Sequence, residues 1–199
     1  MQLPVSVVDD FLDPKDAAAL LAFALEKRDH FTPSAVHEET SGPPAPLDRR
    51  SLSLDADPGA ALDAFHFAVD ARFDTLRYAT GVPEFTEIER EVDLVAHLDG
   101  HHYKSHVDTL SREARAQTSA DRMISMVYYF HREPRAFSGG ELVIYPIAGK
   151  GERVIEPRHN RLVAFPSITP HEVRAIHLES DDFADARFSI ACWLCRARR

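Results

Sequence analysis

The sequence has few cysteines and no long apolar segment. Its two cysteines, Cys192 and Cys195, form a lone C-x2-C pair, which is weak evidence for a zinc or redox site, so both are expected to be reduced packing residues. No segment approaches the roughly 20 apolar residues of a membrane span, and the N-terminus lacks the basic and apolar regions of a signal peptide. These absences make the cytoplasm the expected location.

Basic residues are also too few for a nucleic-acid-binding protein. The chain has 32 acidic and 23 basic side chains and a formal net charge of −9 at pH 7. A long phosphate footprint requires the opposite sign, so nucleic acid is not an expected partner. Compact basic clusters occur only at Arg49-Arg50 and at Arg196–Arg199, and we interpret both as solvated surface.

The composition is that of one soluble globular domain. Of the 199 residues, 44% are hydrophobic and 28% are charged. A chain of this length can bury roughly 70% of its unfolded surface, so it needs no disulfide or structural metal for stability. We expect residues 1–199 to form a single domain, with 1–84 as an N-terminal helical support region and 85–199 as a β-rich core.

Two helices are expected in the N-terminal region. The first runs from Pro14 to about Arg28, with Asp13 as its cap. A loop is expected over residues 32–47, which contain four prolines. The second helix runs from Pro58 to about Thr80 and is stopped by Gly81. Apolar residues recur along it at helical spacing and predict a face that packs on the core: Leu62, Phe65, Val69, Phe73 and Leu76.

Short β-rich runs follow one another after Phe85. Turn residues separate them, and this spacing is typical of a sandwich or barrel, with jelly rolls among the options. The predicted strands, including one earlier run, are residues 50–54, 86–97, 103–107, 123–130, 141–145, 153–155, 161–165, 172–177 and 187–195. The expected fold is mainly β with N-terminal helices, an α+β arrangement in which two helices pack against a barrel or double sheet.

Three residues form a candidate metal site. His106 and Asp108 alternate along a predicted strand and therefore share a face. His171, which follows Pro170, begins a later strand-like run. Two histidines and one carboxylate form the facial triad of non-haem Fe(II) oxygenases, which leaves three positions for a co-substrate and O2. Zinc enzymes also use this donor set, so the donors alone do not identify the metal.

The last predicted strand carries a candidate anion site. Arg187, Ser189 and Trp193 fall on one face of it. An arginine that faces a barrel interior requires an anion, because an unpaired buried guanidinium is costly. A dicarboxylate can supply that anion through a bidentate pair, with the Ser189 hydroxyl as an added donor. The alternative is a structural salt bridge to an acidic side chain.

Together these motifs resemble a known family. The order Y-x-x-H-x-D, S-G-G-E-L, P-H-E-V and R-x-S with a later tryptophan resembles the prolyl 4-hydroxylase branch of the 2-oxoglutarate/Fe(II)-dependent dioxygenase superfamily, over roughly residues 94–194. The resemblance implies a double-stranded β-helix core, the cupin-like jelly roll, with Fe(II) bound by His106, Asp108 and His171. It also implies that Arg187 contacts the distal carboxylate of 2-oxoglutarate.

The resemblance extends to the walls of the expected site. It implies that Tyr129 contacts the same carboxylate as Arg187, whereas Tyr128 points to the other face of its strand. Gly139-Gly140 occupies the place where the family makes a tight backbone approach, and an ordinary hairpin turn is the alternative. Three further residues are candidates for the substrate wall, with core packing as the alternative: Tyr103, Leu142 and Trp193.

The resemblance also implies a reaction. The co-substrates would be 2-oxoglutarate and O2, with ascorbate as a stimulant, and the product would be a hydroxylated C–H position. The hypothetical substrate is a prolyl or other residue of a peptide or protein, and the alternative is a small molecule or free amino acid. Two rival classes use the same barrel: a zinc- or manganese-dependent cupin-like hydrolase or isomerase, and a non-catalytic binding module. No residue predicts the oligomeric state.

One departure from the family pattern lies before the candidate arginine. The stretch between His171 and Arg187 is long and acidic. The nearer Arg174 has the wrong strand parity, so Arg187 is retained as the anion-binding residue. The loops over residues 109–122 and 179–185 are expected to flank the entrance of the site.

A second departure precedes Tyr103. The segment there lacks an aromatic residue that is common in the family, and it contains His97, His101 and His102 instead. All three histidines are expected at the rim of the site, without a direct role.

Overall fold

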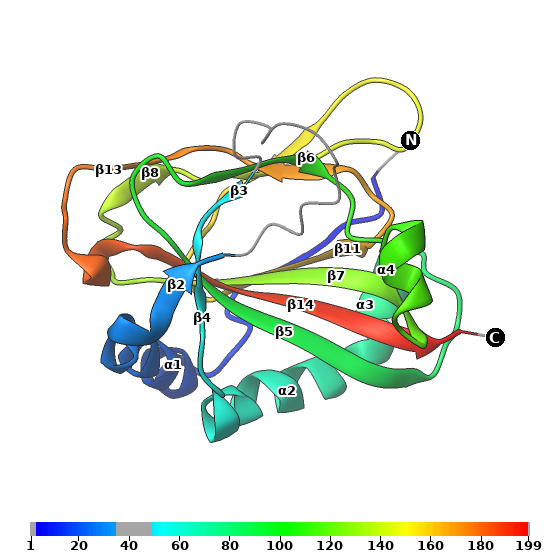
Figure 1. Ribbon diagram of the computed structural model, residues 1–199, viewed down its shortest axis with the longest axis horizontal. Coiled ribbons are helices and arrows are strands. Elements are labelled where there is room, and N and C mark those ends of the chain that lie inside the picture. Colours follow the sequence, from blue (N-terminus) through cyan, green and yellow to red (C-terminus); the bar gives the residue numbers. More distant parts are fainter. Residues whose placement is uncertain (1–2, 35–48, 199) are drawn as a thin grey trace.

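The computed structural model describes residues 3–34 and 49–198 of the chain. Helices, a seven-stranded sheet and a five-stranded sheet form three successive layers (Figure 1). The described strands pair antiparallel in both large sheets. A two-stranded sheet lies at one end of the molecule. Two antiparallel sheets that face each other form a jelly roll, so the predicted fold class is confirmed.

The seven-stranded sheet consists, in spatial order, of β1 (Ser6–Val8), β11 (Arg161–Pro166), β7 (Ala120–Phe130), β14 (Arg187–Ala197), β5 (Glu87–His97), β4 (Leu52–Leu54) and β2 (Phe31–Pro33). The five-stranded sheet consists of β10 (Arg153–Ile155), β9 (Leu142–Ile144), β12 (His171–Val173), β6 (His102–His106) and β3 (Arg49–Arg50). The two-stranded sheet pairs β13 (Ile176–Leu178) with β8 (Phe137–Gly139).

Three of the α-helices cover the outer face of the seven-stranded sheet (Figure 1). They are α1 (Pro14–Glu26), α2 (Asp63–Asp70) and α3 (Phe73–Ala79). The short α4 (Arg112–Ala116) stands apart from them, beside the C-terminal end of β14. The 3-10 helices are η1 (Arg28–His30), η2 (Gly59–Leu62) and η3 (Phe183–Asp185). None of the described helices has the length and apolar character needed to cross a bilayer.

Alternation along β14 gives the seven-stranded sheet two different faces. The side chains that point toward the helices are apolar and buried: Phe188, Ile190, Cys192 and Leu194. The alternate side chains, which include Arg187, Ser189 and Trp193, point toward the five-stranded sheet. The central strand therefore supplies both the hydrophobic core and one wall of an interior cavity.

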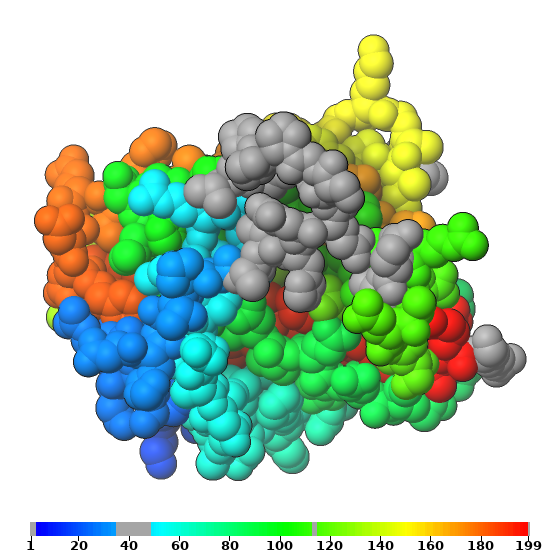
Figure 2. Space-filling model, viewed as in Figure 1, coloured from blue at the N-terminus to red at the C-terminus, as the bar shows by residue number. Residues whose placement is uncertain are grey.

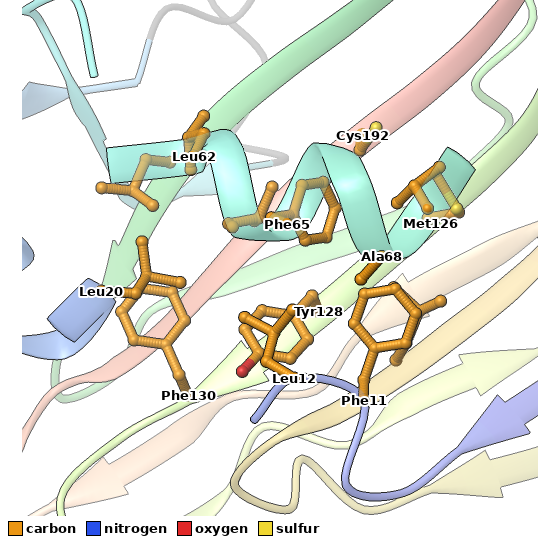
Figure 3. Close-up of a cluster of buried hydrophobic side chains, with 14 of the residues drawn as sticks. Phe11, Leu12, Leu20, Leu62, Phe65, Ala68, Met126, Tyr128, Phe130 and Cys192 are labelled. Atoms are coloured by element: carbon orange, nitrogen blue, oxygen red, sulfur yellow. The ribbon is translucent and has the colours of Figure 1, made fainter. Parts of the chain in front are cut away.

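The core lies between α2 and strand β7 (Figure 3). Phe65 of α2 is 1% exposed, and its ring centroid is 5.8 Å from that of Tyr128 on β7. The predicted apolar face of this region is thus confirmed by its burial against the sheet. Cys192 lies in the same cluster, and both cysteines are buried free thiols, as predicted.

The helical segments differ from the prediction in their bounds. Helix α1 ends at Glu26, and the Asp13 side chain forms no capping hydrogen bond. The single helix predicted from Pro58 to Thr80 is divided into η2, α2 and α3, with a break at Ala71-Arg72. Gly81 lies two residues after the end of α3 and has a φ of +66°. Glycine adopts this left-handed conformation readily, which explains why the helical region ends there.

Several predicted strands are also divided. The run 50–54 separates at Ser51 into β3 and β4, which belong to different sheets, and the run 172–177 separates into β12 and β13. Strand β2 occupies part of the loop predicted over 32–47, and residues 35–47 of that loop lie outside the described residues. Strands β1, β2 and β8 and helix α4 were not predicted as such, because three to five residues carry too little periodicity.

Candidate functional site

The pairing of β6 with β12 brings two histidines together. His106, the last residue of β6, lies opposite His171, the first residue of β12, with ring centroids 4.2 Å apart. Asp108 Oδ1 is 3.6 Å from His106 Nε2, and its Oδ2 is 3.5 Å from His171 Nε2. Two donors bound to one ion at about 2.1 Å lie at most about 4.2 Å apart, so this spacing suits a single divalent cation. Within residues 3–34 and 49–198, this is the one group of three or more such donors.

Hydrogen bonds fix the orientation of both imidazoles. The Nδ1–H of His106 donates to the Lys104 carbonyl at 2.8 Å, and that of His171 donates to the Thr169 carbonyl at 2.9 Å. A carbonyl only accepts, so each Nδ1 carries the proton and each Nε2 keeps its lone pair. Burial lowers the pKa of His171, which favours the neutral form that binds metals.

Asp108 reaches the histidines from a loop. Strand β6 ends at His106, so strand alternation does not place Asp108, contrary to the prediction. Its backbone N–H donates to the Ser167 carbonyl at 3.0 Å and holds the loop against the strand that precedes His171. Burial alone would raise the pKa of the Asp108 carboxyl. A hydrogen bond from His106, and the positive charges of His171 and His106 when these imidazoles are protonated, instead hold that pKa well below its ordinary value. The carboxylate is therefore ionised at neutral pH.

Arg187 faces the interior of the jelly roll, as predicted. The side chain is 1% exposed, and neither its Nε nor its Nη1 has a hydrogen-bond partner among the described residues. Its guanidinium carbon lies 5.2 Å from the centre of the Tyr129 ring, and the buried Tyr129 hydroxyl likewise has no partner there. Burial lowers the pKa of Arg187, yet a guanidinium keeps its proton in proteins. The interior thus presents a cation and a phenol with unused hydrogen-bonding capacity.

His97 is the partner of Arg187, and its predicted place at the rim is wrong. The register of β14 with β5 sets Arg187 opposite His97, and Arg187 Nη2 donates to His97 Nδ1 at 2.9 Å. His97 is 5% exposed, and burial lowers its pKa well below the usual value, so its Nδ1 is free to accept. His101 is buried as well, whereas His102 is partly exposed. The one signal in the sequence was the position of His97 at the end of a long predicted strand.

The metal-binding candidates and Arg187 line one cavity. The volume of this cavity is about 70 Å³. Ser189, Tyr103, Leu142 and Trp193 line it as well, and the Tyr103 ring stacks on His106 with centroids 3.6 Å apart. Tyr128 points away into the helical core, as predicted. The structure therefore brings the predicted site residues to this cavity except Tyr129, which does not line it and lies behind it beside Arg187.

Arg49 also lines this cavity, although its pair with Arg50 was predicted to be solvated surface. Its Nη2 lies 3.1 Å from Asp93 Oδ2, and its Nε donates to the Ser51 hydroxyl at 2.8 Å. The guanidinium carbon is 5.3 Å from the centre of the Tyr103 ring. A dipeptide of arginines on a short edge strand gave no indication that one of them points inward.

Two glycines permit the approach of the β8 end to β13. Gly139 and Gly140 both have a φ of +71°. A Cβ on Gly139 would lie 2.3 Å from the Ala175 carbonyl oxygen, and one on Gly140 would lie 3.1 Å from Arg187 Cδ. The tight approach expected at Gly139-Gly140 is present, and it leaves room for the Arg187 side chain.

The two loops expected beside the entrance lie at opposite ends of β14 (Figure 1). The segment 179–185 contains η3 and directly precedes Arg187, and its Asp182 and Asp185 lie 3.4 and 3.2 Å from Arg132. The segment 109–122 contains α4 and lies beside the C-terminal end of β14. Their position beside the entrance stays a prediction. Arg174 is exposed and paired with Glu152, which supports the choice of Arg187.

A jelly roll that holds two histidines, a carboxylate and a buried arginine around one cavity defines the class of metal-dependent oxygenases. The model of the 2OG-Fe(II) oxygenase superfamily matches residues 92–195, and the chain belongs to this superfamily. It is 30% identical over 196 residues to an uncharacterized PKHD-type hydroxylase of Synechocystis sp.. The match covers 94% of this chain and 61% of that relative. The chain spans about three fifths of the length of this curated relative.

Solved structures share the fold. A prolyl hydroxylase from Trichoplax adhaerens, in complex with a hypoxia inducible factor oxygen degradation domain peptide fragment, matches with a TM-score of 0.70 and 19% identity, over 97% of this chain and 84% of that one. A Pseudomonas putida prolyl-4-hydroxylase matches with a TM-score of 0.64 and 24% identity, over 99% of this chain and 95% of that one. At these identities the likeness establishes a common fold.

The residues of the cavity fit the two groups that the superfamily name implies. The donor triad suits a divalent iron, since it offers two imidazole nitrogens and one carboxylate. The unpartnered atoms of Arg187 and Tyr129 suit a carboxylate, which has about four lone-pair sites to accept from them. The donor triad and Arg187 line one cavity, so each group has a matching partner there.

Proposed function

We propose that the chain hydroxylates a C–H bond of a prolyl residue in a peptide or protein, using Fe(II) and 2-oxoglutarate. In this proposal His106, Asp108 and His171 bind the iron, and Arg187 binds the distal carboxylate of 2-oxoglutarate with help from Tyr129 and Ser189. The observation that carries it is the buried Arg187 guanidinium, which lines the same cavity as the donor triad and has no hydrogen-bond partner at Nε or Nη1 among the described residues. The buried Tyr129 ring lies beside it, 5.2 Å from its guanidinium carbon. A buried unpaired guanidinium is costly, so an anion should normally accompany it.

The protein's own residues position and polarise the bound groups. The carbonyls of Lys104 and Thr169 orient the two imidazoles, and the stacked Tyr103 ring restrains His106. The ionised Asp108 supplies one negative charge to the metal. When bound, Fe(II) and 2-oxoglutarate supply the O2 chemistry that oxidises an unactivated C–H bond.

The substrate side of the cavity is assigned to Tyr103, Leu142 and Trp193. All three side chains line the same cavity as the donor triad and Arg187. A flat aromatic wall suits a compact ring such as that of proline. The names of the similar proteins, a PKHD-type hydroxylase and two prolyl hydroxylases, support a prolyl substrate.

Succinate release measures this function directly. Protein with Fe(II), 2-oxoglutarate, O2 and ascorbate, which we expect to stimulate, is given proline-containing peptides or free amino acids. We expect release above the uncoupled rate with peptides, and a mass increase of one oxygen on the prolyl residue. Coupling to free amino acids alone would favour the small-molecule alternative. Hydrolysis or isomerisation with zinc or manganese, without consumption of 2-oxoglutarate, would contradict the proposal.

A further inference from the structure

A second hollow lies at the end of β14 that is remote from Arg187. Its volume is about 550 Å³, and we name it the α4 groove. Its lining includes Val82, Leu110, Arg115, Arg122, Ile168 and Arg196. Helix α4 and the last residues of β14 lie side by side at this end of the molecule (Figures 1 and 2). The hollow has an apolar floor, to which Ile168 contributes although 55% of it is exposed. An open apolar hollow of this size suits a segment of polypeptide.

One arginine separates this groove from the catalytic cavity. Arg122 lines the groove, and its Nη1 donates to the Asp108 carbonyl at 3.4 Å. Its guanidinium carbon lies 4.0 Å from the centre of the Trp193 ring, and Trp193 lines the catalytic cavity. Thr109, the residue after Asp108, lines the groove too. A peptide whose target residue enters the cavity would therefore continue along the α4 groove.

The groove and the two hollows that adjoin it are basic, although the chain as a whole is acidic. Their lining includes the acidic residues Glu84 and Asp121. It includes five arginines: Arg112, Arg115, Arg122, Arg196 and Arg198. A local excess of arginine on a protein with a net charge of −9 is unexpected for a merely solvated surface.

Two of these arginines form no ion pair with another described residue. Arg115 forms two hydrogen bonds with Asp121, at 3.0 and 3.1 Å, and Arg122 is paired with Glu91. Arg112 and Arg196 are exposed, and neither has an ion-pair or hydrogen-bond partner in the part of the chain that the structure describes. Their guanidinium groups are available to carboxylates of a partner.

We propose that the α4 groove binds an acidic segment of the polypeptide substrate, beside the residue that is hydroxylated. The inference rests on the proposed function and adds a sequence preference to it. Trp193 and Arg196 are three residues apart on β14, roughly 10 Å at 3.3 Å per residue. An extended peptide has a similar rise, so its carboxylates would lie roughly three or more residues from the target residue.

Peptide binding without turnover tests this surface. A labelled peptide with one proline carries two glutamates, three and four residues away on one side, and a second peptide carries them on the other side. Matched peptides carry glutamine or lysine instead. Fluorescence anisotropy is measured with Fe(II) and 2-oxoglutarate in the absence of O2. We expect one glutamate peptide to bind at least about fivefold more tightly than its glutamine counterpart, as two exposed ion pairs would give.

Charge reversal separates a direct contact from a structural effect. The double variant R112A/R196A should lose the preference for glutamate, and R112E/R196E should prefer the lysine peptide. Arg28→Ala is the control, because Arg28 is exposed and lies on η1, near the opposite end of the molecule. It should bind the glutamate peptide like the wild type.

Three results would overturn the inference. They are equal binding of glutamate and glutamine peptides, an unchanged preference in R112E/R196E, and tighter arginine-dependent binding of an oligonucleotide than of the glutamate peptide. Aerobic succinate release distinguishes the two proposals. Equal turnover of neutral and acidic peptides would refute the groove and leave the proposed function intact. Arginine-dependent binding without turnover of any peptide would refute the proposed function and support the groove.

Discussion

Arg187 places a positive charge inside the jelly roll, and one neutral histidine accepts a hydrogen bond from it. Breaking a buried charged pair is strongly destabilising because it leaves a charge without compensation, and Arg187 already lacks partners at Nε and Nη1. His97 accepts a hydrogen bond from Nη2, and the hydrogens of Nε and Nη1 stay without a partner among the described residues. The hydrogen bond to His97 therefore fixes the orientation of the Arg187 guanidinium, and with it the direction of the N–H groups at Nε and Nη1.

Replacing His97 tests this positioning role. His97→Ala should weaken 2-oxoglutarate binding about five- to tenfold, or about 1–1.4 kcal/mol, because the guanidinium loses the acceptor that orients it. His97→Asn should retain most of the affinity, since the Asn Oδ1 occupies a place similar to that of Nδ1. Anaerobic titration with 2-oxoglutarate measures both. A loss of Fe(II) affinity equal to the loss of 2-oxoglutarate affinity would instead indicate a general structural defect.

Gly140 gives a second prediction at this scale. Gly140→Ala should lower the free energy of unfolding by about 2–4 kcal/mol, because its positive φ is strained for alanine and the new methyl would press on Ile176 and Arg187. Gly149→Ala is the matched control: its φ is +99°, and no atom lies within 4 Å of the added methyl. Denaturant unfolding compares them. Equal losses would show that backbone strain alone is responsible.

Alternation along a strand predicts the positions of some site residues from the sequence, but it does not predict contacts between strands. Alternation along one strand needs no knowledge of neighbours, and it correctly set Arg187, Ser189 and Trp193 on one face. The contact between Arg187 and His97 joins residues 90 positions apart and depends on the register of β14 with β5. Register is determined by the pairing of whole strands, which a single sequence does not display.

At the scale of elements, α2 covers the seven-stranded sheet mainly through Phe65. Phe65→Ala should lower the free energy of unfolding by about 3–5 kcal/mol, because it leaves a cavity against Tyr128. Phe67→Ala, two residues along the same helix, should cost little, because Phe67 is 76% exposed. Urea denaturation measures both. A large loss in the Phe67 variant would mean that this exposed face is covered by something else.

Long elements are predictable from the sequence, and short ones are not. Strands β5, β7 and β14 each have eleven residues, and apolar side chains recur along them often enough to be recognised. The division of the run 50–54 between two sheets has a tertiary cause: β3 pairs with β6, whereas β4 pairs with β5. When a chain passes from one sheet to the other within five residues, the pattern of apolar residues is too short to show where it changes sheets.

At the scale of the whole molecule, two sheets enclose the site and one strand connects its parts. Strand β14 carries Arg187 at one end, Trp193 further along and Arg196 near the other end. In the two proposals, the partner of the co-substrate, the substrate wall and the α4 groove therefore follow one another along a single strand. This order depends on the antiparallel pairing of β14 with both β5 and β7.

Buried histidines make the stability of the whole fold depend on pH. Burial lowers the pKa of His97, His101, His131 and His171 below the usual 6.5. Below that pH the unfolded chain binds protons that the folded chain does not, so the free energy of unfolding should fall as the pH decreases. Each such histidine contributes up to about 1.4 kcal/mol per pH unit.

Denaturant unfolding between about pH 7.5 and about pH 5.5 checks this dependence. The wild type should lose stability below about pH 6.5, and His97→Asn should lose it less steeply, by up to about 1.4 kcal/mol per pH unit. Identical slopes in the two proteins would show that His97 takes up its proton without difficulty in the folded state.

The central claim is that one cavity holds both an Fe(II) site and an anchor for 2-oxoglutarate. Anaerobic titration of the protein with Fe(II) and then with 2-oxoglutarate tests it most directly, through a weak visible charge-transfer band. We predict the band in the wild type, its loss in Asp108→Ala, and at least about 30-fold more 2-oxoglutarate for the same band in Arg187→Ala, as expected for a broken buried charge pair. A wild-type protein without the band, or a band that persists in Asp108→Ala, would contradict the claim.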